Sequence, residues 1–426
     1  MCKTAFANQI IPEQKDTIGF FMTVTLTDRK ETASEQPAVT TTRLTFILGA
    51  LTSFAPFATD MYLASFPVLA KYFSTGLGQI QLGLSLFFLG LAGGQLIYGP
   101  MVDRFGRKKP LLVGVSVFIL ASLALTVAPN IESFIALRLL QAIGGCSGMI
   151  ISRAIINDLF APREVARVLS LMMLVQGLGP ITAPILGGYI LVFAGWKAIF
   201  VFLALFGTAC FLATLFGLPE TLPRHRRLNH NASDIFRTFS GLLRQRDFIV
   251  PALTGSLAFG GLFAYISGSP FVFMELHGVS QEHYGWLFGA NACGMIMAAQ
   301  INRFLLIRFS PLQVLVAALT INVSAALAML LMAGNLSFPM LVALLWIALS
   351  ILPLIGANAT ALGMAAGRKY GGSASAIIGV LQFSLASIVS ALVGVFHNGT
   401  SYPMICIILA CGLSAGSVLF FGKKPA

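Results

Sequence analysis

The sequence predicts an all-α integral membrane protein whose chain crosses the bilayer twelve times. Hydrophobic residues make up 57% of its 426 residues and charged residues only 10%, and the mean hydropathy is +0.87. A soluble core cannot hide that much apolar surface, whereas runs of about 20 apolar residues match the thickness of a bilayer. A barrel strand would show about 10 residues of alternating polarity. The apolar runs of this chain are too long and uninterrupted for that pattern.

Twelve apolar runs are the expected membrane-spanning helices. They cover residues 44–70, 81–101, 110–129, 134–156, 168–193, 197–218, 249–274, 284–301, 312–333, 338–361, 374–396 and 402–421. The runs fall into two groups of six, at 44–218 and 249–421, separated by a polar, basic stretch at 219–248. This stretch is expected to be a cytoplasmic linker with a short amphipathic helix near 235–243. Two halves of nearly equal length indicate an internal duplication.

A faint sequence repeat supports the duplication. DRFGRKKP follows the second run at 103–110, and NRFLLIRFSP follows the eighth run at 302–311. The second copy keeps the Arg-Phe pair and the downstream proline but has Asn in place of Asp. The two segments occupy corresponding places in the two halves.

The distribution of Lys and Arg predicts that both termini are cytoplasmic. If the N-terminus lies inside, 24 of the 27 basic residues lie on the inner side, and only Lys71 and Lys197 lie outside. Positively charged loops stay cytoplasmic, so this asymmetry sets the orientation. The net charge of +12 thus reflects topology and contact with anionic lipid, and no nucleic-acid partner is expected.

The terminal segments are expected to be cytoplasmic tails. Residues 1–43 are polar and mixed in charge, without the apolar core of a cleavable signal, so we expect them to be disordered, with Met22 as an alternative start. Residues 422–426 form the second tail. The six cysteines form no CxxC pair and are expected to be packing residues, so no metal site is predicted.

Asp60 is the only acidic residue deep inside any of the apolar runs. A carboxyl group in hydrocarbon costs about 2.5–3.5 kcal/mol on insertion scales, so such residues usually face a bundle interior and carry protons or ions. The position of Asp60 therefore predicts a transporter driven by protons. The alternative is a structural carboxyl group that caps a helix kinked near Pro56.

The strongest motif follows the second run, where residues 99–109 read GPMVDRFGRKK. Asp103 can face the positive end of a neighbouring helix, Gly106 permits a tight turn, and Arg107 lies four residues after Asp103. A plain positively charged loop would need neither the glycines nor the aspartate at these spacings. The segment resembles the motif G-x-x-x-D-R-x-G-R-[RK] of the major facilitator superfamily. That resemblance implies two six-helix halves around a central cavity and a transport function.

Arg138 lies inside the fourth run, in the segment ALRLLQAIGG at 136–145. An unpaired guanidinium there is costly, so it should face the cavity and find a carboxylate, a backbone carbonyl or water. The segment resembles the family motif R-x-x-Q-G, which is associated with proton coupling, although Ala142 replaces the usual glycine. We therefore expect Arg138 to tune the proton affinity of Asp60 across the cavity. A structural arginine that fixes helix packing is the alternative.

The fifth run contains the segment GLGPITAPILGG at 177–188. Its prolines remove backbone hydrogen bonds and its glycines reduce bulk, so the helix can bend and approach a partner closely. The segment resembles the A-P-x-x-G-G form of the family's antiporter motif, although prolines and glycines are common in membrane helices in general. The residues concerned are Gly179, Pro180, Pro184, Gly187 and Gly188.

Further segments narrow the resemblance to one group of the family. They are DMYL at 60–63, GQLIYGP at 94–100, RAIINDLF at 153–160, GWKAIF at 195–200, ETLP at 220–223 and GSASAIIGVLQF at 372–383. Together they resemble the bicyclomycin-resistance (Bcr/CflA) group of bacterial drug:proton antiporters over all twelve runs. The chain departs from that group at Ala64, where Pro is usual, and at Asn157, where a basic residue is common. Neither change removes a titratable group from the cavity.

The charged loop is expected to act as a latch on the cytoplasmic side, formed by Asp103, Arg104, Gly106, Arg107 and Asp158. Arg107 should bridge Asp103 to Asp158. Asp103 should also contact the start of helix eleven at 371–375, where free N–H groups and the helix dipole are positive. Such a latch would hold the halves together on the inside and favour the outward-open state.

The scarcity of polar residues in the apolar runs favours a lipophilic substrate. A sugar or anion carrier generally needs several hydrogen-bonding or positive groups in its cavity. The few Asn and Gln side chains in these runs could line a cavity, but each could equally hydrogen-bond to a neighbouring helix. The candidate cavity residues are Tyr62, Gln141, Asn291, Asn358 and Gln382.

The expected function is proton-coupled export of drugs or other lipophilic molecules across the bacterial inner membrane. The alternative is a proton-coupled transporter of a specific metabolite, such as an amino acid or a sugar. The chain has no P-loop, no metal-ligand cluster and no sizeable soluble domain, so neither an enzyme nor a receptor is indicated. No cofactor is expected apart from the coupling proton. The expected partners are the drug and the bilayer, with the chain as a monomer.

Overall fold

The computed structural model describes residues 41–160, 162–223, 227, 232–367 and 370–422, without side chains for 41–42, 162–176 and 232–236. The tail expected to be disordered therefore lies almost entirely outside the described residues, as do the last four residues. Every described element longer than a turn is a helix. The prediction of an all-α protein is confirmed for this part of the chain.

The first half of the chain contains the elements that cover predicted runs one to six. They are α2 (Thr41–Thr52), α3 (Phe54–Asp60), the 3₁₀ turn η1 (Leu63–Ser65), α4 (Phe66–Tyr72), α5 (Leu77–Phe105), α6 (Lys108–Leu125), α7 (Ile131–Leu159), α8 (Pro162–Ala194) and α9 (Trp196–Gly217). Five of the six runs are continuous helices. The first run is divided into α2, α3, η1 and α4.

The second half follows the linker, whose amphipathic helix α10 (Ala232–Leu243) confirms the helix expected there. Its other elements are α11 (Arg246–Pro270), the π-helical η3 (Phe271–Leu276), α12 (Gln281–Leu305), α13 (Pro311–Leu331), α14 (Phe338–Ser350), α15 (Leu352–Ala366), α16 (Gly371–Val395) and α17 (Tyr402–Phe421). The tenth predicted run is divided between α14 and α15. Proline at position 353 lies in the first turn of α15, where its missing N–H is tolerated.

The break between α2 and α3 has a local cause. The hydroxyl groups of Thr52 and Ser53 both donate to the carbonyl oxygen of Gly49, at 2.8 and 3.1 Å, and compete with its backbone partner. Pro56 follows in the first turn of α3 and has no N–H to continue the ladder of α2. The sequence therefore divides this span before it reaches Asp60.

Ten described helices, counting each continuous helical stretch once, are long and apolar enough to cross a membrane, or eleven if the bent stretch from 43 to 72 is one span. The eighth predicted run, at 284–301, is the one missing from this count; it lies in α12, which has 25 residues but is more polar than the other spanning helices. The count of twelve spans is thus not reached on length and composition alone. The polar character of α12 has a structural reason, because Asn291 and Asn302 are buried inside the bundle.

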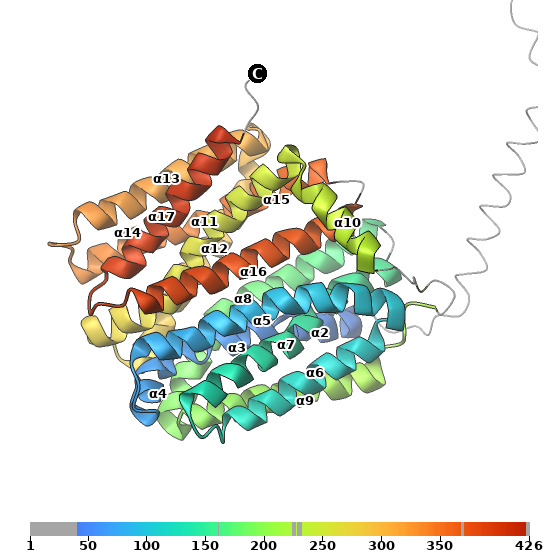
Figure 1. Ribbon diagram of the computed structural model, residues 1–426, viewed down its shortest axis with the longest axis horizontal. Coiled ribbons are helices and arrows are strands. Elements are labelled where there is room, and N and C mark those ends of the chain that lie inside the picture. The colour runs from blue at the N-terminus through green and yellow to red at the C-terminus, as the bar shows by residue number, and fades with distance from the viewer. Residues whose placement is uncertain (1–40, 161, 224–226, 228–231, 368–369, 423–426) are drawn as a thin grey trace, which may run out of the picture. The chain divides into compact units, whose positions relative to one another are not determined.

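The two halves meet along two helix pairs. α5 of the first half packs against α16 of the second, as Figure 1 shows, and α8 packs against α12. Glycines permit close approach in both pairs: a Cβ atom at Gly78 would lie 2.8 Å from the carbonyl oxygen of Gly394, and one at Gly188 would lie 2.7 Å from that of Gln281.

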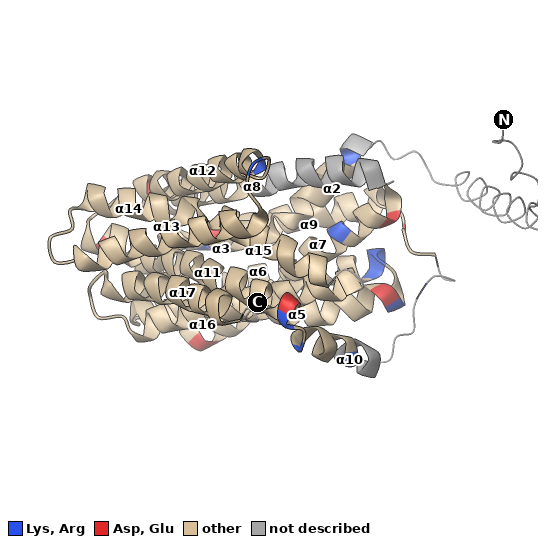
Figure 2. Cartoon of the chain, turned by 90° about the horizontal axis from the view of Figure 1, so that it is seen from above, with Lys and Arg blue, Asp and Glu red and all other residues tan. Residues whose placement is uncertain are grey.

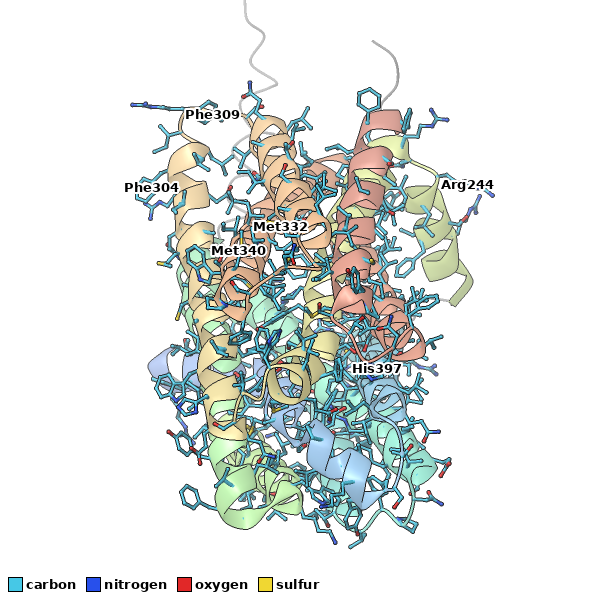
Figure 3. The ribbon with its side chains drawn as sticks, turned by 90° about the vertical axis from the view of Figure 1, so that its left-hand side faces the viewer. Arg244, Phe304, Phe309, Met332, Met340 and His397 are labelled. Atoms are coloured by element: carbon cyan, nitrogen blue, oxygen red, sulfur yellow. The ribbon has the colours of Figure 1, made fainter. Side chains whose placement is uncertain are left out.

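The outer surface of the bundle is suited to lipid. Phe304 and Phe309, near the end of α12, are 67% and 50% exposed and point outward in Figure 3. The helix bodies in Figure 2 are almost free of charge, and the described charged residues gather mostly toward one end of the helices. We call the end that carries Asp103 the charged end.

Candidate functional site

Asp60 lies at the last residue of α3, where the first span breaks for a second time. Its side chain is buried, with 4% of the residue exposed, and no ion pair among the described residues includes it. The chain then turns through Met61 and Tyr62 into η1, and Pro67 in the first turn of α4 prevents a continuous helix. The structure thus confirms a buried carboxyl group at a helix break.

The glycines of the antiporter-like segment let α8 pack directly against this break. A Cβ atom at Gly187 would collide with the carbonyl oxygen of Met61, the residue after Asp60. A Cβ atom at Gly179 would lie 3.3 Å from the ring of Pro56. With the contact of Gly188 to α12, one helix touches both the Asp60 region and the second half. The predicted close approach of helix five is confirmed, and Pro180 and Pro184 lie inside it.

Arg138 is fully buried in α7, and of the partners expected for it, a carboxylate is not found among the described residues. Its Nη1 donates to Oε1 of Gln141 at 2.6 Å, and Gln141 in turn donates to the hydroxyl group of Ser122 at 2.8 Å. The guanidinium carbon lies 4.2 Å from the ring centre of Tyr62 and 4.3 Å from that of Phe87. No described ion pair joins Arg138 to Asp60, and the tuning of the Asp60 proton affinity by Arg138 across the cavity stays a prediction. Aromatic rings and an amide replace the carboxylate.

Two of the candidate cavity residues are consequently occupied within the first half. Tyr62 stacks on Arg138, and its hydroxyl group donates to the carbonyl oxygen of Ile80 at 3.4 Å. Gln141 links Arg138 to α6. The Nε and Nη2 atoms of Arg138 have no described hydrogen-bond partner. A fully buried guanidinium that keeps free N–H groups has the capacity to bind a further acceptor.

A polar cluster in the second half was not predicted, apart from Asn291. Asn291 in α12 donates to the hydroxyl group of Tyr265 in α11 at 2.9 Å, and the hydroxyl groups of Ser269 and Tyr284 lie 3.0 Å apart. All four residues are buried. Tyrosines in an apolar run carry no pattern of their own, so sequence reasoning passed over them.

The remaining candidate amides differ in their surroundings. Asn358 in α15 donates to Oδ1 of Asn302 in α12 at 2.8 Å, so it joins two helices rather than lining a described cavity. Asn322 in α13 does the same by donating to the carbonyl oxygen of Ala348 at 2.9 Å. Gln382 is half-buried in α16.

At the charged end, Arg107 forms the bridge that the sequence predicted. Its Nη1 lies 2.9 Å from Asp103 Oδ1 and its Nε lies 2.9 Å from Asp158 Oδ2. Burial lowers the pKa of Arg107, but the hydrogen bonds to Asp158 and Asp103 outweigh it, so the pKa lies above its usual value. Among the described residues, the carboxylate of Asp103 accepts a hydrogen bond only from Arg107. Its expected contact with residues 371–375 stays a prediction. Arg104 is exposed beside this network.

Glu220 completes the network, and sequence reasoning gave it no role beyond the ETLP resemblance. Its carboxylate accepts hydrogen bonds from the backbone N–H groups of Arg107 and Lys108, at 2.8 and 3.3 Å, and so satisfies the start of α6. Gly106 has a φ of +90°, and a Cβ atom there would collide with Glu220. Only glycine suits both the turn and this contact.

Hydrogen bonds join the two halves toward the end opposite the charged end. Gln81 Nε2 in α5 donates to the carbonyl oxygen of Ser267 in α11 at 2.9 Å. One turn further, the hydroxyl group of Ser85 donates to the carbonyl oxygen of Ser387 in α16 at 2.7 Å. We call these contacts, together with that of Gly78, the interhalf seam.

Two sets of helices joined by close glycine contacts, with a buried carboxyl group at the break of the first span, define a membrane transporter. The chain belongs to the Major Facilitator Superfamily, whose sequence pattern matches residues 48–391. The proteins of this family that resemble it are transporters rather than enzymes.

Curated relatives cover most of the chain. It is 38% identical to the uncharacterized MFS-type transporter YdgK of Bacillus subtilis (strain 168), over 89% of this chain and 94% of that protein. It is 34% identical to the bicyclomycin resistance protein homolog of Haemophilus influenzae, over 85% of this chain and 92% of that protein. It is 27% identical to the multidrug resistance protein MdtL of Shigella dysenteriae, over 87% and 93% respectively.

The fold is also found among solved structures. A bacterial homolog of the human lysosomal transporter Spinster, in an inward-facing and occupied conformation, superimposes with a TM-score of 0.70 at 16% identity, covering 92% of this chain and 100% of that chain. At this identity the likeness concerns the fold.

Proposed function

We propose that the chain is a drug:proton antiporter that exports lipophilic small molecules across the bacterial inner membrane. The observation that carries this proposal is the buried Asp60, which lies at a helix break and has no ion-pair partner among the described residues. A carboxyl group in such a place binds and releases a proton without first breaking an ion pair. Groups of this kind are the usual proton carriers of membrane transporters.

In the proposed cycle, the proton and the substrate occupy the bundle in turn. Release of the substrate outside allows Asp60 to be protonated there, which neutralises it. The return of the cavity to the inside then carries the proton inward. Each charge that crosses the membrane contributes about 2.3 kcal/mol per 100 mV of potential, which is enough to bias the direction of the cycle.

The proposed topology has twelve spans with both termini in the cytoplasm. It is supported by the asymmetry of Lys and Arg and by α12, whose 25 residues are long enough to span and whose asparagines face the interior. The charged end is then cytoplasmic and the interhalf seam lies toward the outer side. The bacterial relatives are consistent with an inner-membrane location.

The substrate class follows from which polar groups are already engaged. Asn322 and Asn358 bond to other helices, and Gln141 bonds to Arg138, so few amides are left for a sugar or an amino acid. The names of two relatives, which refer to bicyclomycin resistance and multidrug resistance, support a drug as the substrate. We propose bicyclomycin and lipophilic drugs as the first substrates to test.

The charged network is proposed to act as a cytoplasmic latch in the outward-open state of the transporter. Arg107 holds Asp103 and Asp158 in place, which leaves Asp103 at the inner end of α5. When the cytoplasmic side closes, Asp103 would meet the start of α16. If this contact contributes about 1–3 kcal/mol, it would change the ratio of the outward-open to the inward-open state roughly 5- to 150-fold.

The decisive experiment measures uphill transport by Asp60→Asn. Susceptibility of a pump-deficient strain to bicyclomycin, ethidium and other drugs first identifies a substrate. Inverted vesicles from cells with wild-type protein should then accumulate that drug when a proton gradient is imposed, whereas Asp60→Asn should bind it without accumulation. Glu132→Gln, at the far end of α7, is the matched control. Uphill accumulation by Asp60→Asn at the wild-type rate would rule out the proposal.

A further inference from the structure

A cavity of about 420 Å³ lies between the two halves, on the side that the proposed topology places outside. The first half contributes Pro67 of α4 and Val192 of α8. The second half contributes residues from the end of α11 to the start of α12, namely Met274, Glu275, Val279, Ser280, Gln281 and Glu282. A volume of this size suits a molecule of drug size. We call it the outer cavity.

Close contacts of α8 separate the outer cavity from the break of the first span. A Cβ atom at Gly187 would collide with the carbonyl oxygen of Met61, and one at Gly188 would lie 2.7 Å from the carbonyl oxygen of Gln281. Val192 follows Gly188 by four residues, so it lies on the same face of α8, one turn closer to the end of the helix. The outer cavity therefore begins one helical turn beyond the contact that covers the break.

Hydrogen bonds hold the wall that the second half contributes. After the π-helical turn η3, Gly278 adopts a φ of +67°, and the N–H group of Val279 donates to the carbonyl oxygen of Phe273 at 2.9 Å. Ser280 is the N-cap of α12, and its hydroxyl group lies 2.7 Å from Nδ1 of His283. The wall is thus fixed on both sides of the loop, and the cavity is preformed.

Two carboxylates, Glu275 and Glu282, supply all the charge in the lining of the outer cavity. Glu275 is exposed and Glu282 is half-buried, and no ion pair among the described residues includes either of them. Glu282 lies in the first turn of α12, where the helix dipole favours a negative charge. Two negative charges without a positive partner attract a cation to this cavity.

The rest of the lining favours an organic cation over a metal ion. The apolar residues of the lining are Pro67, Val192, Met274 and Val279. Among the described residues, no group of three or more His, Cys, Asp or Glu side chains is placed to hold a metal ion. A lipophilic cation can bury its apolar body against these side chains while its charge stays beside the carboxylates.

The basic side chains on the same side do not line the outer cavity. The sequence places only Lys71 and Lys197 on the outer side, and neither is part of the lining. Lys197 lies over the ring of Trp196 in the first half. His277, which follows η3, packs on the ring of Phe338, with 4.7 Å between the ring centres. The charge of the lining is therefore negative.

We propose that the outer cavity is a release site for lipophilic organic cations, which the carboxylates of Glu275 and Glu282 attract. When α8 separates from Met61 and Gln281, the cavity joins the region of Asp60, and a cationic drug passes into it. An uncharged drug leaves without this attraction. The site therefore favours cations among the exported drugs. This inference rests on the proposed function for the orientation of the chain and the outward direction of transport.

The first test measures binding to purified full-length protein in nanodiscs of zwitterionic lipid, with tetraphenylphosphonium as the probe. Two charges about 4 Å apart in water change an affinity about fivefold, so Glu275→Gln with Glu282→Gln should weaken binding about fivefold for each carboxylate lost. Wild-type binding should also weaken as salt is added, and the double variant should lose most of this dependence. Glu132→Gln is the matched control, because it removes a carboxylate at the start of α7 that does not line the cavity.

Equal affinity and equal salt dependence in the wild type and the double variant would overturn the proposal. So would a loss of the same size in Glu132→Gln. If the double variant does not fold, Glu275→Gln and Glu282→Gln are measured singly, and wild-type affinity in both would have the same consequence.

The second test locates the bound probe. Gln281→Cys places a thiol in the lining, and Asn335→Cys places one in the exposed loop between α13 and α14. At ten times its dissociation constant, tetraphenylphosphonium should slow the reaction of Gln281→Cys with a thiol reagent about tenfold. Asn335→Cys should react at one rate with and without the probe, and the unsubstituted protein gives the background. An unprotected thiol in Gln281→Cys would place the probe elsewhere and overturn the proposal.

Transport separates this inference from the proposed function. In inverted vesicles, the double variant should accumulate ethidium, a cation, more slowly relative to uncharged bicyclomycin than the wild type does. Uphill transport by Asp60→Asn would refute proton coupling through Asp60 while leaving both binding tests readable. Conversely, tetraphenylphosphonium binding that survives the loss of both carboxylates would refute the cation site even if Asp60→Asn abolishes uphill transport.

Discussion

Gln81 Nε2 donates a 2.9 Å hydrogen bond to the carbonyl oxygen of Ser267, across the boundary between the two halves of the bundle. The two residues are 186 positions apart in the chain. Ser267 in turn hydrogen-bonds Ser390 of α16 at 3.2 Å, so α5, α11 and α16 share one polar contact. In hydrocarbon, such a contact stabilises the arrangement in which these helices are together.

Gln81→Leu should therefore shift the protein toward a state that is open at the interhalf seam. Hydrogen bonds between membrane helices contribute about 0.6–1.7 kcal/mol, which corresponds to a roughly 3- to 20-fold change in the ratio of states. Spin labels at Gly76→Cys and Asn398→Cys, on either side of the seam, measure the distance between the halves. The longer distance should gain population in Gln81→Leu and not in Gln79→Leu, which is exposed. Equal distance distributions in both variants would contradict this role.

Gly187→Val should abolish transport by displacing α3 next to Asp60. Even a single Cβ atom at this position would collide with the carbonyl oxygen of Met61. Overpacking of this kind costs about 1–3 kcal/mol and here changes the helix that carries Asp60. Drug accumulation in inverted vesicles should fall at least tenfold, while Gly93→Val, where the added Cβ atom meets no heavy atom within 4 Å, should stay near wild type. Normal transport by Gly187→Val would show that this contact is not needed.

Arg138→Lys should impair turnover although it keeps the charge. The guanidinium of Arg138 stacks between the rings of Tyr62 and Phe87 and bonds to Gln141, and a lysine ammonium reproduces neither the flat stacking nor the forked donor geometry. A reduction of about tenfold in the initial rate of uphill transport is expected, with little loss of folded protein in size-exclusion chromatography. Arg153→Lys, on the same helix, is the control. A wild-type rate would indicate that Arg138 contributes only its charge.

Asp103→Ala should move the population toward the inward-open state if the latch is correct. Arg107 would keep its bond to Asp158, so the first half should stay folded while the proposed contact with α16 is lost. A cysteine placed on the cytoplasmic side of the cavity should react faster with a thiol reagent, by roughly 5-fold or more. Drug affinity in the inward state should change little. Loss of drug binding without faster labelling would instead assign Asp103 to a substrate site.

Local spacing was enough to predict several of the contacts at the charged end. Asp103 and Arg107 are four residues apart, and Gly106 supplies the positive φ that the turn requires. The role of Glu220 could not be predicted in this way, because it depends on where the chain returns after α9. Nothing in the sequence near Glu220 specifies that it accepts from the N–H groups of Arg107 and Lys108.

The buried polar groups show more clearly which contacts could not be predicted from the sequence. Asp60 and Arg138 stand out in apolar runs because each is costly there, so the sequence identified both. It could not identify their neighbours, such as the rings of Tyr62 and Phe87 on which Arg138 stacks. Tyr265 and Tyr284 are inconspicuous in the sequence, yet the fold places the hydroxyl group of Tyr265 against Asn291 and that of Tyr284 against Ser269.

The sequence by itself determined that the chain is a helical membrane protein, where its apolar runs lie, and which residues are out of place in them. These properties depend on composition and on the length of a bilayer, which act on each segment separately. Only the tertiary structure decided that Gly187 meets Met61, that Gln81 reaches Ser267, and that α12 keeps its polar residues inside. The physical reason is that lipid and helix surfaces are equally apolar, so partners are chosen by close packing and by single hydrogen bonds between helices far apart in the chain.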